Sequence, residues 1–390
     1  MTRFSPADLD DIRARHPLAD IAGQYVKLRR AGARLVGPCP VCGGRAASQR
    51  FEILPDGAGW VCAVCNDGGD VIRLVEKADN CDFLAAVARL GGQATADPAE
   101  TRRLLDGRET KRLAREKTAA KFREAERKRL YEAWRSALPL RGTPAARYLE
   151  GRGIVLPPVC PGLGYLPRAP YFHGEDIDLR GRSMPRMIHQ GPALLAAFIR
   201  ADGTFGGLHT TFLDDADPPR KLALKDGQTG EPLPAKKMRG SKTGAHIAVS
   251  PLIENPSCLV IGEGIETVLS VLTAMHGAGR DILNTAFCAA GDLGNLAGRA
   301  IETVAHPTLK RPDGRAQRVP GPMPDPDDAG LSIPEQVAEL ILLGDGDSDE
   351  VLTWHAMERA ARRYTREGRE IRIVMAPAGM DFNDLMRGEQ

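Results

Sequence analysis

The sequence predicts a multidomain protein in which α+β and α/β parts follow one another along 390 residues. Three observations support this prediction: two Cys-x-x-Cys pairs near the N-terminus, a basic middle section with many prolines, and a C-terminal section in which apolar strands alternate with amphipathic helices. We therefore expect four regions. They are a metal-binding domain at 1–95, a charged helical linker at 96–136, a β-rich basic subdomain at 137–250, and an α/β domain with a parallel sheet at 251–390.

The composition is that of an ordinary globular chain, with 42% hydrophobic and 27% charged residues and a formal net charge of +2. No apolar run approaches the roughly 18 residues of a membrane span, and the N-terminus has no signal-peptide core. We therefore expect a cytoplasmic protein without a membrane partner. In that compartment, paired cysteines favour a metal site over disulfides.

The cysteine pairs Cys39/Cys42 and Cys62/Cys65 have the spacing of a zinc ribbon. Four thiolates from two short knuckles can surround one Zn²⁺ tetrahedrally, and a site filled by protein ligands is structural and not catalytic. Pro55-Asp56-Gly57 predicts a hairpin turn between the knuckles. Basic and aromatic side chains nearby suit contact with single-stranded nucleic acid, although the two aromatic rings suit the ribbon core equally well. These side chains are Arg50, Phe51 and Trp60.

Residues 8–92 resemble the N-terminal CHC2-like zinc-binding domain of bacterial, phage and plasmid DNA primases. The matching stretches include Tyr25-Val26-Lys27-Leu28, Gly37-Pro38-Cys39-Pro40 and Gly69-Asp70-Val71-Ile72. The family usually has a histidine as its second zinc ligand, whereas this chain has Cys42. Thiolate also suits zinc, so we expect the site to survive and to hold the metal more tightly.

The middle of the chain is rich in basic residues. The run at 100–135 predicts a long, mostly solvated linking helix. Strands predicted at 192–200 and 206–213 are followed by a basic loop. Its cations suit the phosphates of a nucleotide or a DNA template, with a solvated loop as the open alternative. They are Lys221, Lys236, Lys237, Arg239 and Lys242.

Acidic residues lie at the end of, or just after, three predicted strands of the C-terminal section, which cover 258–264, 337–343 and 371–375. The carboxyl ends of parallel strands meet at one edge of a sheet, so these acids are expected to gather there. Carboxylates this close repel one another unless a cation lies between them, which predicts a divalent metal site. The acids are Glu263, Asp345, Asp347, Asp381 and Asp384.

Residues 255–388 resemble the Toprim domain shared by primases, topoisomerases and some nucleases. The resemblance implies that Glu263, Asp345 and Asp347 are catalytic. It also implies that Asp345 and Asp347, together with Asp381 and Asp384, hold Mg²⁺ or Mn²⁺. The nearby Asp349 is more simply explained as a helix cap.

Two features depart from the pattern of cellular primases. The fourth residue after Glu263 is usually an aspartate, whereas here it is Thr267, with Glu266 one step earlier. A proline-rich insertion at 307–326 also precedes the strand that leads to Asp345. The identity of a second acid after Glu263 therefore stays open.

Together the resemblances imply a DNA primase that synthesises short RNA primers on single-stranded DNA by metal-dependent nucleotidyl transfer. Ribonucleoside triphosphates, a single-stranded DNA template, one structural Zn²⁺ and a catalytic Mg²⁺ or Mn²⁺ would be its substrates and cofactors. No helicase motor follows the acids, so a replicative helicase would act in trans, and the compact architecture suggests a mobile element or phage. Two alternatives stay open: a Toprim-type metal-dependent DNA nuclease, and a non-catalytic DNA-binding scaffold.

Overall fold

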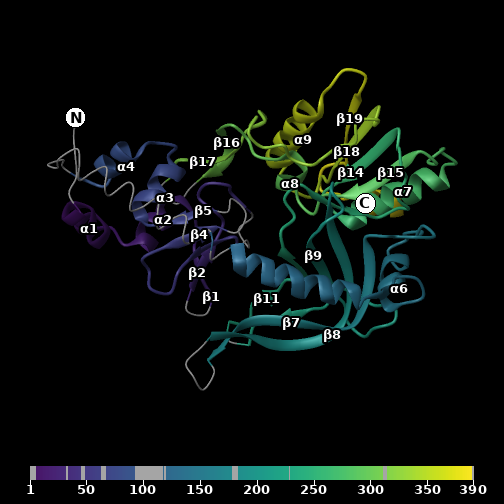
Figure 1. The fold of residues 1–390 in the computed structure, drawn as a ribbon, viewed down its shortest axis with the longest axis horizontal. Helices are drawn as coiled ribbons and strands as arrows, with labels where there is room; N and C mark the ends of the chain where they lie inside the picture. The colour runs from purple at the N-terminus through teal and green to yellow at the C-terminus, as the bar shows by residue number, and fades with distance from the viewer. Residues whose placement is uncertain are drawn as a thin grey trace. The chain divides into compact units, whose positions relative to one another are not determined.

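The computed structural model describes residues 6–31, 34–44, 49–62, 67–92, 117, 120–177, 183–227, 229–310 and 314–388. The chain divides into two compact units, shown as ribbons in Figure 1. No described helix is both long enough and apolar enough to cross a membrane. The first unit comprises Met1–Lys121, Gly174–Met184 and Thr303–Val319, and the second comprises Phe122–His173, Pro185–Glu302 and Pro320–Gln390. The four sequence regions stay a prediction.

The N-terminal part of the first unit is a five-stranded antiparallel sheet flanked by four short helices. The predicted turn at 55–57 joins two of these strands, and Asp70 caps the third helix by accepting a hydrogen bond from the Arg73 amide. Buried apolar residues of the four helices and of the two strands joined by the 55–57 turn form one core. The elements are α1 (Pro6–Arg15), α2 (Leu18–Tyr25), β1 (Arg29–Ala31), β2 (Arg34–Gly37), β3 (Phe51–Ile53), β4 (Trp60–Cys62), β5 (Asp67–Gly69), α3 (Val71–Ala78) and α4 (Phe83–Arg89).

The second unit is organised around one continuous sheet. Its strand order is β12-β9-β8-β13-β15-β14-β18-β19, with β7 also paired to β8 and β6 to β7. Strands β15, β14, β18 and β19 are parallel, as expected from the alternation of strands and helices. The strands are β6 (Leu138–Pro139), β7 (Leu163–Ile177), β8 (Ser183–Arg200), β9 (Phe205–Phe212), β12 (Lys236–Gly240), β13 (Ala245–Ala248), β14 (Cys258–Gly262), β15 (Thr285–Ala289), β18 (Glu339–Gly344) and β19 (Glu370–Met375).

Strand β13 joins two parts of the sheet that the sequence suggested were separate. It pairs antiparallel with β15 on one side and with β8 on the other, through Ala245 opposite Arg200 and His246 opposite Ile199. The β-rich and parallel parts therefore share one sheet. A four-residue strand gives too short a pattern to be recognised from sequence, because its pairing is entirely non-local.

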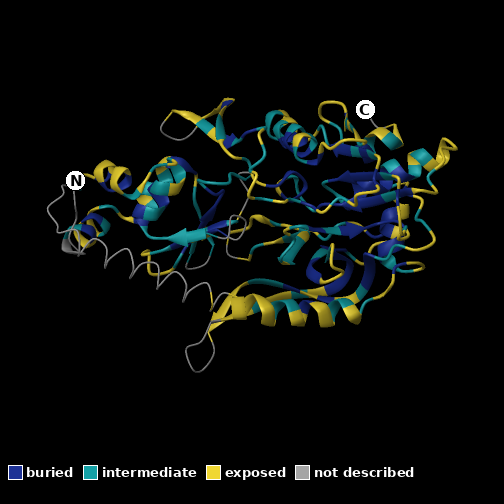
Figure 2. Ribbon diagram, turned by 45° about the horizontal axis from the view of Figure 1, so that its top comes forward, coloured by how far each residue is buried: buried dark blue, intermediate teal, exposed yellow. Residues whose placement is uncertain are grey.

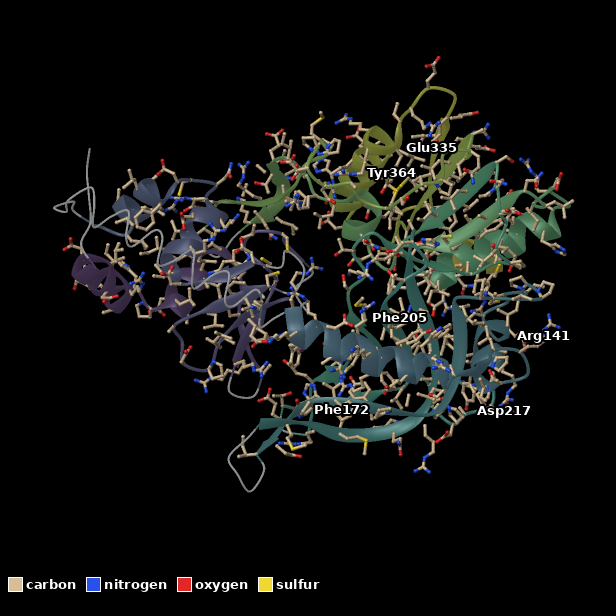
Figure 3. All side chains as sticks on the ribbon, in the orientation of Figure 1. Arg141, Phe172, Phe205, Asp217, Glu335 and Tyr364 are labelled. Atoms are coloured by element: carbon tan, nitrogen blue, oxygen red, sulfur yellow. The ribbon has the colours of Figure 1, made fainter. Side chains whose placement is uncertain are left out.

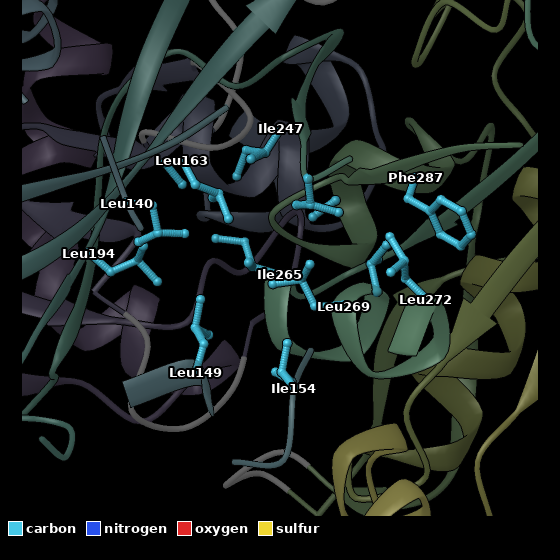
Figure 4. Packing of buried hydrophobic residues seen from close by; sticks show 14 of the residues in the cluster. Leu140, Leu149, Ile154, Leu163, Leu194, Ile247, Ile265, Leu269, Leu272 and Phe287 are labelled. Atoms are coloured by element: carbon cyan, nitrogen blue, oxygen red, sulfur yellow. The ribbon is translucent and has the colours of Figure 1, made fainter. Parts of the chain in front are cut away.

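Helices cover the parallel part of the sheet and bury its apolar side chains. Figure 4 shows Ile265 and Leu269 of the helix after β14 packed near Leu149, Leu163 and Leu194. A second cluster lies between the sheet and the helix after β18. The helices are α6 (Pro144–Glu150), α7 (Ile265–Gly277), α8 (Leu293–Ala297), α9 (Glu350–Tyr364) and α10 (Phe382–Arg387). Two short strands, β10 (Leu224–Lys225) and β11 (Pro232–Leu233), form a separate hairpin.

The described helix at 120–135 is only partly the solvated linker that its charge predicted. Most of residues 120–129 are exposed (Figure 2). Leu130 is buried, however, and packs with Trp134 and Phe205 in an apolar cluster under the β-rich sheet. The expectation missed this contact because the apolar residues are sparse among lysines, arginines and glutamates.

The proline-rich insertion forms a two-stranded hairpin, β16 (Thr303–Lys310) and β17 (Ala316–Pro320). Arg359 of α9 contacts the chain both just before and just after this hairpin. Its buried guanidinium donates hydrogen bonds to the carbonyl oxygens of Gly298 at 3.0 Å and Gly321 at 2.6 Å. The insertion therefore leaves the sheet intact.

Candidate zinc site and candidate acidic metal site

Three of the four predicted zinc ligands come together. The Sγ atoms of Cys39, Cys42 and Cys62 all lie within 4.8 Å of one another, and the distance from Cys42 Sγ to Cys62 Sγ is 3.7 Å. A tetrahedral zinc with Zn–S bonds of about 2.3 Å separates its sulfurs by about 3.8 Å, so the spacing fits the ion. Cys65 lies outside the described residues.

The backbone shapes the first knuckle. Cys39 and Gly43 exchange two N–H···O bonds of 2.9 Å, and the Val41 amide points at Cys39 Sγ at 3.4 Å. Gly43 adopts φ +71°, a conformation that favours glycine. The backbone hydrogen bonds of this tight turn thus hold Cys39 and Cys42 close together without help from a metal.

Phe51 and Trp60 form the core of the ribbon, which decides between the two roles that the sequence left open. Both side chains are at most 1% exposed, and their rings stack with centroids 5.4 Å apart. The Trp60 indole N–H donates to the Asp70 carbonyl oxygen at 3.2 Å. Neither ring offers a free face to a nucleic-acid base, so the predicted base stacking is wrong for this conformation. Arg50 precedes β3 and is half-buried.

The predicted acids follow the strands as expected. Glu263 comes directly after β14, and Asp345 and Asp347 come directly after β18, the neighbouring parallel strand (Figure 1). Burial raises the pKa of Asp345 to about 6, and the negative charges of Glu263, Asp347 and Asp381 add to the effect. A divalent cation relieves repulsion among neighbouring carboxylates, and carboxylate oxygens are the donors that Mg²⁺ and Mn²⁺ prefer. The residues therefore fit such an ion.

The acids are not gathered as tightly as the cysteines. Within the described parts of the chain, the cysteine group is the only set of three or more potential metal ligands whose donor atoms all lie within 4.8 Å. The acids thus share one edge of the sheet without forming a closed set of ligands.

The loop with Asp345 and Asp347 is tied to the loop that leads to Asp381. The Gly346 amide donates to the Met380 carbonyl at 2.9 Å, and the Gly379 amide donates to the Gly346 carbonyl at 2.8 Å. A Cβ atom on Gly346 would collide with the carbonyl oxygens of Ala376 and Pro377. Glycine is therefore required between the two aspartates by the close approach of backbone, not by an unusual φ.

Asp381 and Asp384 also have structural partners. Asp381 caps α10 by accepting from the amides of Asn383 and Asp384, both at 2.8 Å, and Asp384 accepts from the Asp381 amide at 3.2 Å. Arg152 lies 3.8 Å from Asp381. This capping box explains both acids without a metal, and their metal role stays a prediction. Asp349 caps α9 by accepting from the Leu352 amide at 2.9 Å, as expected.

The two residues after Glu263 have different surroundings. The Thr267 hydroxyl donates to the Asp345 carboxylate, with distances of 2.9 and 3.2 Å to its two oxygens. Glu266 instead accepts hydrogen bonds from Tyr148, Lys221 and Lys236. Thr267 is therefore the residue that faces the acidic edge, and it supplies a hydrogen-bond donor instead of a carboxylate.

Three of the five cations predicted in a basic loop lie on strand β12 instead, and this corrects the expected grouping. They are Lys236, Lys237 and Arg239. Alternation along a strand places successive side chains on opposite faces. Lys236 contacts Glu266, whereas the Lys237 ammonium lies 3.6 Å from the Tyr171 ring centroid and donates to the Phe172 carbonyl oxygen (Figure 3 labels Phe172). Burial lowers the pKa of Lys237 to about 8.

The remaining predicted cations also have acidic partners. Arg239 pairs with Glu126 of the helix at 120–135 at 2.8 Å, and Lys242 pairs with Asp292. Only Lys221 and Lys236 of the five predicted cations converge on one point. The five do not form a single patch, because the strand separates them and Glu126 and Asp292 hold Arg239 and Lys242. Their nucleotide or DNA contacts stay predictions.

Sequence reasoning missed three residues around this convergence. Tyr148 of α6 and Arg152 just after it come from a section with no recognised motif. His209 of β9 is next to Met238 in the sheet, its Nδ1 is buried without a partner, and burial lowers its pKa to about 4. One sequence feature could have indicated this buried polar cluster: the acid Glu266 lies at the start of an otherwise apolar helix.

Comparisons with known proteins agree with the sequence motifs. Family models match residues 4–103 (CHC2 zinc finger), 124–249 (a domain of unknown function, DUF7146) and 328–389 (Toprim domain). The N-terminal part is similar to the DNA primases of Mycobacterium tuberculosis, at 37% identity over 89 residues, and Streptomyces coelicolor, at 36% over 93 residues. These alignments cover 23% and 24% of this chain and only 14% of each relative.

A solved structure, the zinc-binding and RNA polymerase domains of the Aquifex aeolicus primase, aligns with 100% of this chain and 83% of its own. The identity is 15% and the TM-score 0.34, which is too low to support an argument. The family models nevertheless confirm the predicted resemblances. The chain carries a CHC2 zinc finger similar to that of DNA primases and, C-terminal to it, a Toprim domain.

Proposed function

We propose that this protein is a DNA primase that synthesises short RNA primers on single-stranded DNA from ribonucleoside triphosphates. One observation carries the proposal: a CHC2 zinc finger similar to those of DNA primases occurs in the same chain as a Toprim match at 328–389 that contains Asp345 and Asp347. Glu263, which precedes the matched residues, follows the neighbouring parallel strand β14. The zinc finger supplies the link to primases, and the acids supply the means for nucleotidyl transfer.

Glu263, Asp345 and Asp347 would hold Mg²⁺ or Mn²⁺ at the sheet edge. When bound, such an ion makes the primer 3′-hydroxyl more acidic and neutralises the departing pyrophosphate. Thr267 orients the Asp345 carboxylate through its hydroxyl. The bridge between Gly346 and the loop at 376–380 holds the two aspartates against the start of α10. The chain thus provides a fixed oxygen-rich edge.

The cysteine ribbon would hold one structural Zn²⁺ and help to select the initiation site on the template. Because Phe51 and Trp60 are buried, this contact would rely on basic side chains such as Arg50 and on backbone groups and not on ring stacking. A replicative helicase acting in trans stays a prediction.

A direct assay tests the proposal. The full chain is incubated with single-stranded DNA, four ribonucleoside triphosphates and Mg²⁺ or Mn²⁺, and labelled oligoribonucleotides are sought. We expect short, template-dependent products that carry a 5′-triphosphate. Cleavage of the template without synthesis would instead identify a nuclease, and DNA binding without either product would identify a scaffold.

A further inference from the structure

We propose that Glu266 is a positioning residue that holds Lys221 and Lys236 together as one binding unit for the polyphosphate of the incoming nucleotide. The choice of ligand rests on the proposed function. The lysines approach the same carboxylate oxygen, Oε2 of Glu266, at 3.1 Å and 3.0 Å. The two ammonium groups therefore lie within about 6 Å of each other.

The carboxylate is built in, whereas the lysines remain accessible. The Glu266 residue is 8% exposed, and its other oxygen accepts a hydrogen bond from the Tyr148 hydroxyl. The side chains of Lys221 and Lys236 are 37% and 40% exposed. The buried anion thus fixes the inner side of both ammonium groups and leaves N–H donors of each for a ligand that approaches from solvent.

Backbone pairing and the position of helix α7 place these three residues. Lys236 pairs in β12 opposite Thr211 of β9, and Lys221 forms an isolated bridge with Leu213, just after the same strand. Glu266 lies in the first turn of α7, three residues after Glu263. The lysine pair is therefore anchored by the same helix that begins at the acidic edge.

The charges around the pair explain why a carboxylate is needed. Lys221 faces Lys236 and Arg152, and His209 and Lys242 are further basic neighbours within the cluster. Burial lowers the pKa of Lys221, and Lys236 and Arg152 lower it further, while Glu266 raises it. Burial alone would raise the pKa of Glu266, but Lys236, Lys221 and Tyr148 together lower it to about 2. Glu266 therefore stays ionised and favours the protonated form of Lys221.

Removal of this charge predicts a pH-dependent defect. In a Glu266→Gln variant, two neighbouring ammonium groups lose their shared anion, so one of them gives up its proton at a lower pH than before. Below that pH both lysines stay charged and polyphosphate binds. Above it the pair carries a single charge and its geometry is lost.

The test is calorimetric titration of the full chain with sodium tripolyphosphate, without added divalent ions, at pH 6.5, 7.5 and 9. The variants are Glu266→Gln, Lys221→Met/Lys236→Met, and the triple combination. The exposed Lys128 of the helix at 120–135 is the matched control, as Lys128→Met. Circular dichroism melting verifies that each variant is folded.

At each pH from 6.5 to 9 we expect Lys128→Met to bind as tightly as the wild type, and the double lysine variant to bind about tenfold more weakly than the wild type. The glutamine variant should match the wild type at pH 6.5 and be about tenfold weaker at pH 9. In the lysine-deficient background, the same glutamine change should have no further effect.

Equal weakening at every pH, or a further loss in the triple variant, would show that Glu266 has a merely structural role. Undiminished binding by the double lysine variant would also overturn the inference. Primer synthesis is measured separately with the same preparations. Its absence in a wild-type protein that shows the expected binding pattern would count against the proposed primase and not against the lysine pair.

Discussion

The two candidate metal sites of this protein are built in opposite ways. The cysteines form a compact group with Sγ atoms within 4.8 Å, inside the core of a small sheet. The acids lie along the edge of a large sheet and do not reach that proximity in the described residues. Thiols can approach one another while neutral, whereas carboxylates repel. That repulsion adds to burial, which is the main cause of the raised pKa of Asp345.

This difference teaches how each site relates to folding. A structural ion is part of the core that it completes, so its ligands are close together in the fold itself. A catalytic ion arrives together with substrate phosphates, which supply some of its ligands.

Loss of two acids should eliminate chemistry while sparing the fold. Asp345→Asn together with Asp347→Asn should reduce primer synthesis by about three orders of magnitude or more, because the edge loses two oxygen ligands and their charges. Product formation on single-stranded DNA is measured by gel. Asp349→Asn is the matched control within the same stretch, since asparagine also caps a helix well and should preserve activity. Retained synthesis in the double variant would refute the assignment.

Loss of one thiolate should instead disrupt the fold of the zinc ribbon. Cys62→Ser should release zinc and unfold the ribbon, since structural zinc contributes about 10 kcal/mol or more to the folding of such domains. The second unit should stay folded, which limited proteolysis would show. Cys81→Ser serves as the control, because Cys81 lies near the Val75 carbonyl and outside the zinc group. A Cys62→Ser protein that still binds one zinc per chain would contradict the site.

The charge on Asp345 should make the stability of the second unit depend on pH when only zinc is bound. The folded pKa is about 6, against about 4 in the unfolded chain, so the protonated acid favours the fold. That stability is fully present below pH 4 and is lost as the pH rises through 6. After a discount for partial exposure, the loss amounts to about 2 kcal/mol. Urea unfolding of the wild type and Asp345→Asn should show it, with a variant difference that changes across this range.

The hydroxyl of Thr267 should have the smallest effect. Thr267→Val removes the donor that lowers the pKa of Asp345, so that pKa should rise above 6. Protons then compete better with the metal, and activity near pH 6.5 should fall about fivefold, with recovery at pH 8.5. Titration of Mg²⁺ at both pH values measures this shift. Thr273→Val is the control, because its hydroxyl bonds to the Leu269 carbonyl on the same helix.

The sequence predicted the acidic edge well because each acid directly follows a strongly apolar strand. Glu263, Asp345 and Asp347 all lie where the strand pattern places them. The zinc knuckles were equally readable, since Cys39, Cys42 and Cys62 are defined by spacing alone. These features depend on local pattern, which a single sequence records.

Features that depend on non-local pairing were beyond reach. Strand β12 is polar and five residues long, so only its pairing with β9 reveals that Lys236 and Lys237 face opposite sides. The short β13 hides the continuity of the sheet for the same reason. For Phe51 and Trp60, aromatic character could not distinguish a core role from a binding role, and burial decides it.

Gly346 sets a limit on how this edge can vary. Its two backbone bonds fasten the loop between the aspartates to the loop at 376–380, and no side chain fits between them. A random library across residues 344–348 should therefore recover only glycine at position 346, even under selection for folding alone. A redesign of the metal preference of this edge must therefore change the acids and keep Gly346, where the two backbone segments touch.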